Sequence, residues 1–262
     1  MLMKDLKQRI FDITKGLPLG ERERHDLAMK SFLSYGYQVI VKAWFATNAE
    51  EGVDFYASEA WHADLHPKID THALADAVRL YTGLVAASEP FSDVLTRLYE
   101  EILLDGRNGD GKAQFFTPID LSQGGAEILL ESGDIKSWDG VKWIGDDTCG
   151  AGSLPLGLLS RIYGVSKSKM KYVILYLNDI DELACKASAL QILSSLVIHN
   201  IKINGLYLHR SNVITEWTKP NTIMLGFKKD EPEPDHDLFK MLDVFSKTVK
   251  QVKTENENRT VT

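Results

Sequence analysis

The chain has 262 residues and a hydrophobic fraction of 44%, enough to bury the core of one large domain or two small ones. It has two cysteines and no Cys/His cluster at metal-ligand spacing, which argues against a disulfide framework or a structural zinc and favours a cytoplasmic location. No apolar run reaches the roughly 20 residues of a membrane span, so no membrane contact is expected. The net charge of −7 opposes non-specific DNA binding, so any contact with DNA needs a local basic patch or a partner.

The first part of the chain, from residue 5 to about residue 104, has apolar side chains three and four positions apart, and this spacing predicts an all-helical segment. Pro18 and Gly20 are expected to end the first helix, and the polar stretch 47–52 is expected to be a loop. Three glycines within residues 105–111 exclude a continuing helix. We therefore predict a helical N-terminal domain over residues 1–105.

After this boundary, short apolar runs alternate with helical segments, a pattern typical of an α/β fold with a parallel sheet and crossover helices. A second domain is predicted over residues 106–230. Its expected strands are 141–145, 172–177, 205–208 and 222–227, and a long helix is expected over 182–199. Residues 231–262 are predicted to hold the end of a charged linker (228–236), one amphipathic helix (238–252) and a disordered polar tail (254–262).

Two features of the second domain suggest a nucleotide-type ligand. The first is a Gly-x-Gly turn, Gly150–Gly152, between the strand at 141–145 and the next helix, because small residues let a ligand approach the backbone at a helix start. The second is Asp179 at the end of the next strand, where an acid accepts hydrogen bonds from ribose hydroxyls. A plain tight turn and a helix cap are the alternatives, and Asp181 fills the capping role equally well. The order and spacing fit a dinucleotide or S-adenosylmethionine.

A third segment gives the chain a family resemblance. The run Gln114-Phe115-Phe116-Thr117-Pro118 followed by the turn Asp146-Asp147-Thr148-Cys149-Gly150-Ala151-Gly152 resembles the modification subunit of type I restriction enzymes and related N6-adenine DNA methyltransferases. The helix with Leu98-Tyr99-Glu100 is also similar to that family. The resemblance covers residues 91–213. It implies a Rossmann-like methyltransferase sheet preceded by a helical domain, with S-adenosylmethionine as the cofactor.

The resemblance also implies a role for each matching residue. Residues 113–118 are expected to close over the methionine end of the cofactor, and Asp146 is expected beside its ammonium group. Asp179 is expected to hold the ribose hydroxyls, and Asn212 is expected to contact the adenine amine. The complete set of expected cofactor-binding residues is Ala113, Gln114, Phe115, Phe116, Thr117, Pro118, Asp146, Cys149, Gly150, Ala151, Gly152, Ser153, Asp179 and Asn212.

One element of the family is missing. DNA amino-methyltransferases carry an Asn/Asp-Pro-Pro-aromatic element at the end of the fourth strand, which orients and stacks the flipped base. Here the corresponding stretch is residues 223–229, in which Phe227 alone is suited to stacking, and the sheet looks shorter than the usual seven strands. Three explanations stay open: a catalytically inactive descendant, a half-protein completed by another chain, and an enzyme with an unrecognisable base-binding element. No catalytic residue is assigned.

The sequence therefore predicts an S-adenosylmethionine-binding protein related to N6-adenine DNA methyltransferases, without independent activity. The alternative is a non-enzymatic module that binds DNA or a restriction-modification partner, such as a phage or mobile-element interference protein. DNA contact through a partner subunit, and a specificity or methylase subunit as that partner, are the expected interactions. Cys149 at a helix start is a weaker nucleophile candidate, because no partner base is apparent. The group Trp61, His62, His66 and Lys68 is interpreted as an interdomain contact rather than a nucleic-acid surface.

Overall fold

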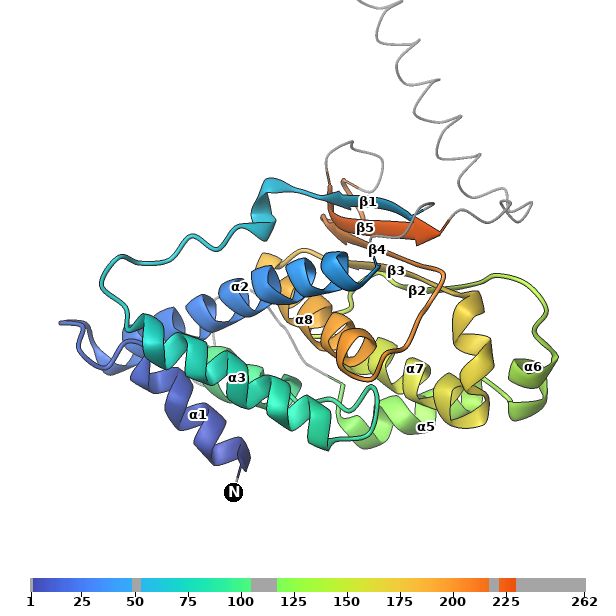
Figure 1. Cartoon of the computed structure of the whole chain (residues 1–262), viewed down its shortest axis with the longest axis horizontal. Helices are drawn as coiled ribbons and strands as arrows, with labels where there is room; N and C mark the ends of the chain where they lie inside the picture. Colours follow the sequence, from blue (N-terminus) through green and yellow to red (C-terminus); the bar gives the residue numbers. More distant parts are fainter. Residues whose placement is uncertain (1, 49–52, 105–116, 217–221, 230–262) are drawn as a thin grey trace, which may run out of the picture.

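The computed structural model describes residues 2–48, 53–104, 117–216 and 222–229. A five-stranded sheet with the order β1-β5-β4-β3-β2 lies along the top of the view in Figure 1, and the helices lie below it. Its strands are β1 (Val53–Ala57), β2 (Lys142–Asp146), β3 (Val173–Asp179), β4 (Gly205–Arg210) and β5 (Ile223–Lys229). The protein is thus mixed α/β with one mixed sheet.

All four strands predicted from the sequence are present, with ends shifted by one or two residues. β2, β3 and β4 are parallel, as predicted. The prediction of a parallel strand at 222–227 is wrong, because β5 runs antiparallel to β4. A parallel neighbour needs a crossover connection, usually a helix. The described residues between β4 and β5 instead form a turn at 213–216, and β5 returns directly beside β4.

The N-terminal part contains α1 (Leu2–Asp12), α2 (Glu21–Asn48), α3 (Thr71–Ala87) and α4 (Thr96–Tyr99). The break expected at Pro18 and Gly20 is confirmed, since it separates α1 from α2. The prediction that residues 5–104 are all helical is wrong, because β1 lies within them and pairs antiparallel with β5. Burial alternates along its five residues, as expected for an edge strand with one covered face.

The helix α8 (Glu182–Ile198) lies at the centre of the molecule and is buried along most of its length. It crosses from β3 to β4 and packs against α2, while α7 (Ser153–Val165) crosses from β2 to β3 and packs against α5 (Ile119–Leu129). A single hydrophobic core runs from Leu6 in α1 to Phe227 in β5. The predicted domain boundary at residue 106 lies outside the described residues and stays a prediction.

The remaining elements are short. They are η1 (Glu59–Trp61), the π-helical turn η2 (Glu100–Leu104), α6 (Ser132–Ser137) and η3 (Lys167–Tyr172).

Within the described ranges, no helix is long and apolar enough to cross a membrane. The helix and tail expected over residues 231–262 lie outside the described residues, whereas Lys228 and Lys229, expected to begin the linker, belong to β5.

Candidate functional site

A cavity of about 520 Å³ opens where the parallel strands β2, β3 and β4 end. Carboxyl ends of parallel strands meet at one edge of a sheet, and the loops that follow them surround a common crevice. Here these loops are residues 146–153 after β2, 179–181 after β3 and 211–213 after β4. The cavity is lined by Thr117, Asp146, Asp147, Thr148, Cys149, Gly150, Ser153, Leu154, Asn178, Asp179, Ile180, Ser211, Asn212 and Val213.

Asp179 ends β3, and its side chain is 7% exposed. Its Oδ2 accepts a hydrogen bond from the Gly150 N–H at 2.9 Å, and its Oδ1 accepts one from the Asp181 N–H at 2.8 Å. Burial raises the pKa of the Asp179 carboxyl, and the backbone donors partly offset that rise. A carboxylate can accept up to four hydrogen bonds, so these backbone donors do not use its full capacity.

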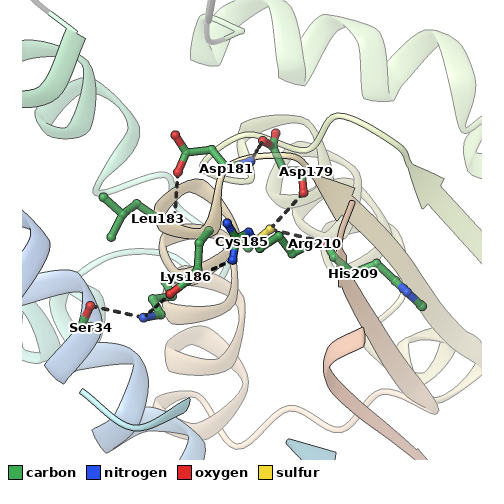
Figure 2. Close-up of polar contacts among 9 residues, drawn as sticks. Ser34, Asp179, Asp181, Leu183, Cys185, Lys186, His209 and Arg210 are labelled. Atoms are coloured by element: carbon green, nitrogen blue, oxygen red, sulfur yellow. Dashed lines mark hydrogen bonds and ion pairs between the residues drawn. The ribbon is translucent and has the colours of Figure 1, made fainter. Parts of the chain in front are cut away.

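The capping role belongs to a different acid. Asp181 is the N-cap of α8, and its Oδ1 accepts a hydrogen bond from the Leu183 N–H at 2.9 Å. Figure 2 shows Asp179 and Asp181 side by side at the start of this helix. Glu182, the first residue of α8, forms ion pairs with Lys186 at 2.9 Å and with Arg210 at 2.8 Å. The start of α8 is thus tied to β4, and the Asp179 carboxylate is left for the cavity.

A second acid of the lining, Asp146, ends β2. Its Oδ1 accepts a hydrogen bond from the Thr148 N–H at 3.1 Å. Burial raises its pKa, and the negative charges of Asp147 and Asp179 raise it further. Of the described residues that line the cavity, none is Lys, Arg or His. Within the described part of the chain, the lining therefore holds three carboxyl groups, those of Asp146, Asp147 and Asp179, and no basic side chain to neutralise them.

The glycine loop, residues 149–153, forms the wall between β2 and α7. Gly150 and Gly152 have φ angles of +53° and +98°, which side-chain-bearing residues rarely adopt. A Cβ at Gly152 would also lie 2.9 Å from Ser188 Oγ in α8. Both the backbone conformation and the packing thus require glycine at position 152, and the plain tight-turn interpretation does not account for the cavity beside it.

Cys149 lines the cavity but is poorly suited to be a nucleophile. It is 5% exposed, and burial raises the pKa of its thiol well above the ordinary value. The nearby acids Asp179 and Asp146 raise it further, because a thiolate would add another negative charge. Since the thiolate is the reactive form, the position favours an inert packing role.

Two of the expected ligand-binding side chains are engaged elsewhere. Ser153 Oγ lies 2.6 Å from Asp93 Oδ2 and 2.8 Å from Thr96 Oγ1. Neither Asp93 nor Thr96 is among the lining residues. Asn212 Oδ1 accepts hydrogen bonds from the Ile214 and Thr215 N–H groups at 3.0 and 3.3 Å, as the cap of the following turn. The adenine amine is a donor, so the expected contact needs Asn212 Oδ1 as its acceptor and competes with these two turn bonds.

The structure adds residues that the sequence did not indicate. Asn178, 3% exposed at the end of β3, donates to the backbone carbonyls of Asp147 (2.9 Å) and Ser211 (3.0 Å) and accepts from Ser211 Oγ at 2.7 Å. It joins all three loops around the cavity. The signal in the sequence is a polar residue within a buried strand, just before the acid. Ile180 is 58% exposed and adds an apolar surface to the cavity.

The expected site residues fall into three groups. Thr117, Asp146, Cys149, Gly150, Ser153, Asp179 and Asn212 lie together around the cavity. Pro118, which caps α5, and Ala151 and Gly152 in the glycine loop are not among the lining residues. Ala113, Gln114, Phe115 and Phe116 lie outside the described residues.

Phe227, expected to be suited to stacking on a base, is not near the cavity. It is 3% exposed, and its ring stacks on Trp44 of α2 with a centroid distance of 3.9 Å. Because β5 is antiparallel to β4, Phe227 pairs with Leu206 near the start of β4, whereas the cavity lies where β4 ends. Its ring is therefore occupied by core packing and does not face the cavity.

No residue of the Trp61 group belongs to the described lining of the cavity. Trp61 packs partly buried against the hydrophobic core, and the Lys42 ammonium of α2 lies 5.4 Å from its ring centroid. With Val41, Phe45, Phe55, Tyr56 and Ala57 it lines a shallow hollow beside β1. His66 and Lys68 are exposed. This arrangement agrees with a packing role for Trp61 between the N-terminal helices and the edge of the sheet.

Comparison with known proteins identifies one family. Residues 91–230, more than half of the chain, match the family model described as N-6 DNA Methylase. No curated protein and no solved structure matches the chain. The matched region begins just before α4 and includes β2 to β5 with the entire cavity lining. The chain belongs to the N-6 DNA methylase family.

Proposed function

We propose that the chain binds S-adenosylmethionine in the cavity at the ends of β2, β3 and β4. The observation that carries this proposal is the charge of the lining, which holds Asp146, Asp147 and Asp179 without any Lys, Arg or His among its described residues. S-adenosylmethionine carries an ammonium and a sulfonium group, and its net positive charge is complementary to this lining. A dinucleotide would bring a pyrophosphate next to three acids, which is unfavourable.

The size and polarity of the cavity also suit this cofactor. Its volume of about 520 Å³ lies within the range of small-molecule sites. In this proposal Asp179 accepts hydrogen bonds from the ribose hydroxyls, and Ile180 and Val213 of the lining contact the adenine ring. The start of the 13-residue helix α7, at Ser153 and Leu154, suits the carboxylate of the methionine part.

Calorimetric titration of the full chain tests the proposal. We expect saturable binding of S-adenosylmethionine and S-adenosylhomocysteine, and no binding of NAD at the same concentration. Asp179→Ala should weaken binding by roughly 100-fold, since it removes a buried charge-assisted hydrogen-bond acceptor. Asp54→Ala, an exposed acid on β1, is the matched control and should bind like the wild type. Absence of binding at millimolar S-adenosylmethionine would refute the proposal.

We further propose that this chain does not transfer a methyl group by itself. No two prolines are adjacent anywhere in the sequence, so the Asn/Asp-Pro-Pro-aromatic element is missing. Residues 223–229, which correspond to the position of that element, form β5, and β5 ends beside the start of β4, away from the cavity. Its Phe227 is buried in the core. Tritiated cofactor and adenine-containing DNA test this proposal, and label incorporated by the isolated chain would contradict it.

A second candidate function is that of one half of a split methyltransferase. It is favoured by the outer edge of β2, which pairs only with β3 among the described strands. It is also favoured by α5, whose Leu121, Ile128 and Leu129 are 63%, 83% and 65% exposed. An open strand edge and an exposed apolar helix are features of a protein that takes up a partner. The labelling assay repeated with a chain carrying the missing element distinguishes this candidate, because methyl transfer would then require both chains.

A further inference from the structure

The segment 91–96, which joins α3 to the first residue of α4, contributes no residue to the cavity lining, yet it is hydrogen-bonded to the glycine loop. The link is made by the Asp93 carboxylate. Its Oδ2 accepts a hydrogen bond from Ser153 Oγ at 2.6 Å, and its Oδ1 accepts from the Thr96 N–H at 3.0 Å and from Gln191 Nε2 at 3.1 Å. One side chain of the N-terminal part thus holds the last residue of the loop.

Gln191 of α8 is the second member of this network. It is 2% exposed, and all four hydrogen-bonding positions of its amide are occupied. Its Oε1 accepts from the Val94 and Leu95 N–H groups at 2.8 and 2.9 Å, and its Nε2 donates to Asp93 and to the Ala151 carbonyl at 3.0 Å. A fully satisfied buried network of this kind rigidifies the segments that it joins.

The glycine loop is therefore held from two sides. On the cavity side, the Cys149 N–H donates to the Asn178 carbonyl at 2.8 Å, and the Gly150 N–H donates to Asp179 at 2.9 Å. On the far side, Ala151 and Ser153 are held by Gln191 and Asp93. Gly150 and Gly152 give the loop more conformational freedom than other residues would. Its geometry must therefore be imposed by these contacts.

We propose that Asp93 and Gln191 are positioning residues, which order the glycine loop before the ligand binds. This inference rests on the proposed cofactor site, but it concerns residues that do not line the cavity. A loop that is ordered in advance spares the ligand the conformational entropy cost of ordering it. When the network is broken, the loop should exchange its amide protons faster, and the ligand should bind more weakly.

The test uses the full chain with Asp93→Asn, which keeps the shape of the side chain and replaces one carboxylate oxygen by a donor. The matched control is Ser195→Ala. Ser195 is 2% exposed in α8, and its Oγ accepts from the Phe91 N–H at 2.7 Å, so it anchors the same segment without a bond to the glycine loop. Both variants should lower the melting temperature, and this shared effect separates stability from positioning.

For Asp93→Asn we expect about tenfold weaker binding of S-adenosylmethionine and faster hydrogen exchange at residues 150–153 in the ligand-free protein. For Ser195→Ala we expect an affinity within about twofold of the wild type and unchanged exchange in the loop. Equal affinity losses in the two variants, or unchanged loop exchange in Asp93→Asn, would overturn the proposal. If Asp93→Asn does not fold, Ser153→Ala breaks the same bond from the loop side. Because Ser153 lines the cavity, hydrogen exchange at residues 150–153 in the ligand-free protein then decides: faster exchange supports the proposal and unchanged exchange overturns it.

Failure of this inference is distinguishable from failure of the proposed function. If the wild type binds no S-adenosylmethionine, the cofactor assignment is wrong, and positioning is then decided by hydrogen exchange in the ligand-free proteins. Faster loop exchange in Asp93→Asn but not in Ser195→Ala would support it, and equal exchange would refute it. Where binding is measurable, the double variant Asp93→Asn/Ser153→Ala should lose little more affinity than either single variant, because the two side chains share one bond. Additive losses would contradict the shared role.

Discussion

The parallel strands and the antiparallel strands of the sheet differ in the residues that they bring together. β2, β3 and β4 are parallel, so their carboxyl ends gather Asp146, Asp179 and the loop at 211–213 around one cavity. β5 and β1 alternate in direction, and their side chains, such as Phe227 and Phe55, pack with Trp44 into an aromatic cluster. Parallel pairing brings the polar residues at the carboxyl ends of the strands together, whereas the antiparallel strands contribute aromatic side chains to the hydrophobic core. The first region should therefore control binding, and the second should control stability.

The largest expected effect is on the antiparallel side. Trp44→Ala removes a ring that is 5% exposed and stacks on Phe227, so it should lower the free energy of unfolding by about 3–5 kcal/mol. Urea unfolding followed by far-UV circular dichroism measures this loss. Affinity for S-adenosylmethionine, corrected for the folded fraction, should stay unchanged. A lower corrected affinity would show that the two regions are coupled.

On the parallel side, Gly152→Ala should affect both stability and binding. The φ angle of +98° and the close approach of Ser188 predict a loss of about 1–3 kcal/mol, together with weaker binding as the loop shifts. Thermal unfolding and calorimetry report the two effects. Gly83→Ala in α3 is the matched control, because a Cβ there meets no atom within 4 Å. It should be neutral or stabilising by up to about 1 kcal/mol. Similar losses in both variants would argue against a special role for position 152.

Asp146→Asn should separate binding from stability. It removes a charge expected beside the ligand's ammonium group, and we expect about tenfold weaker binding of S-adenosylmethionine. The raised pKa of Asp146 means that the folded protein holds this proton more tightly than the unfolded chain does. The charged form is therefore unfavourable at neutral pH, and the melting temperature of Asp146→Asn at pH 7 should be higher than that of the wild type. Asp54→Asn on β1, an exposed site, should change neither quantity.

The smallest expected effect is the pH dependence of the wild type. The raised pKa values of Asp146 and Asp179 bring their protonation closer to neutral pH. Because a cationic ligand prefers the ionised carboxylates, affinity for S-adenosylmethionine should fall as the pH decreases from neutral toward these raised pKa values. The contribution of these carboxyls to folding has the opposite sign, since it is present at low pH and lost as the pH rises through the raised values. Affinity that is independent of pH would show that these carboxylates do not interact with the bound ligand.

Much of the parallel half could be read from local sequence. Apolar runs predicted β2, β3 and β4, and the positions of Gly150, Gly152 and Asp179 predicted where their loops would meet. Local patterns were sufficient here because a buried parallel strand is apolar throughout and a loop with positive φ angles needs glycine. The expected residues Ala113 to Phe116 remain a prediction from the family resemblance.

The antiparallel half depended on contacts between distant residues. The segment 53–57 contains strand-favouring residues but is only five residues long, and it becomes β1 because β5, more than 160 residues later, supplies its hydrogen-bond partner. The direction of β5 was likewise hidden, because strand periodicity is the same for parallel and antiparallel pairing. The roles of Asn178, Asp93 and Gln191 arise from hydrogen bonds between loops that only the tertiary structure brings together. The sequence by itself indicated the family, the parallel strands and the glycine loop, because these depend on local patterns. The tertiary structure decided how the sheet closes, which acids meet in one cavity and what holds that cavity in shape, because these depend on contacts between distant residues.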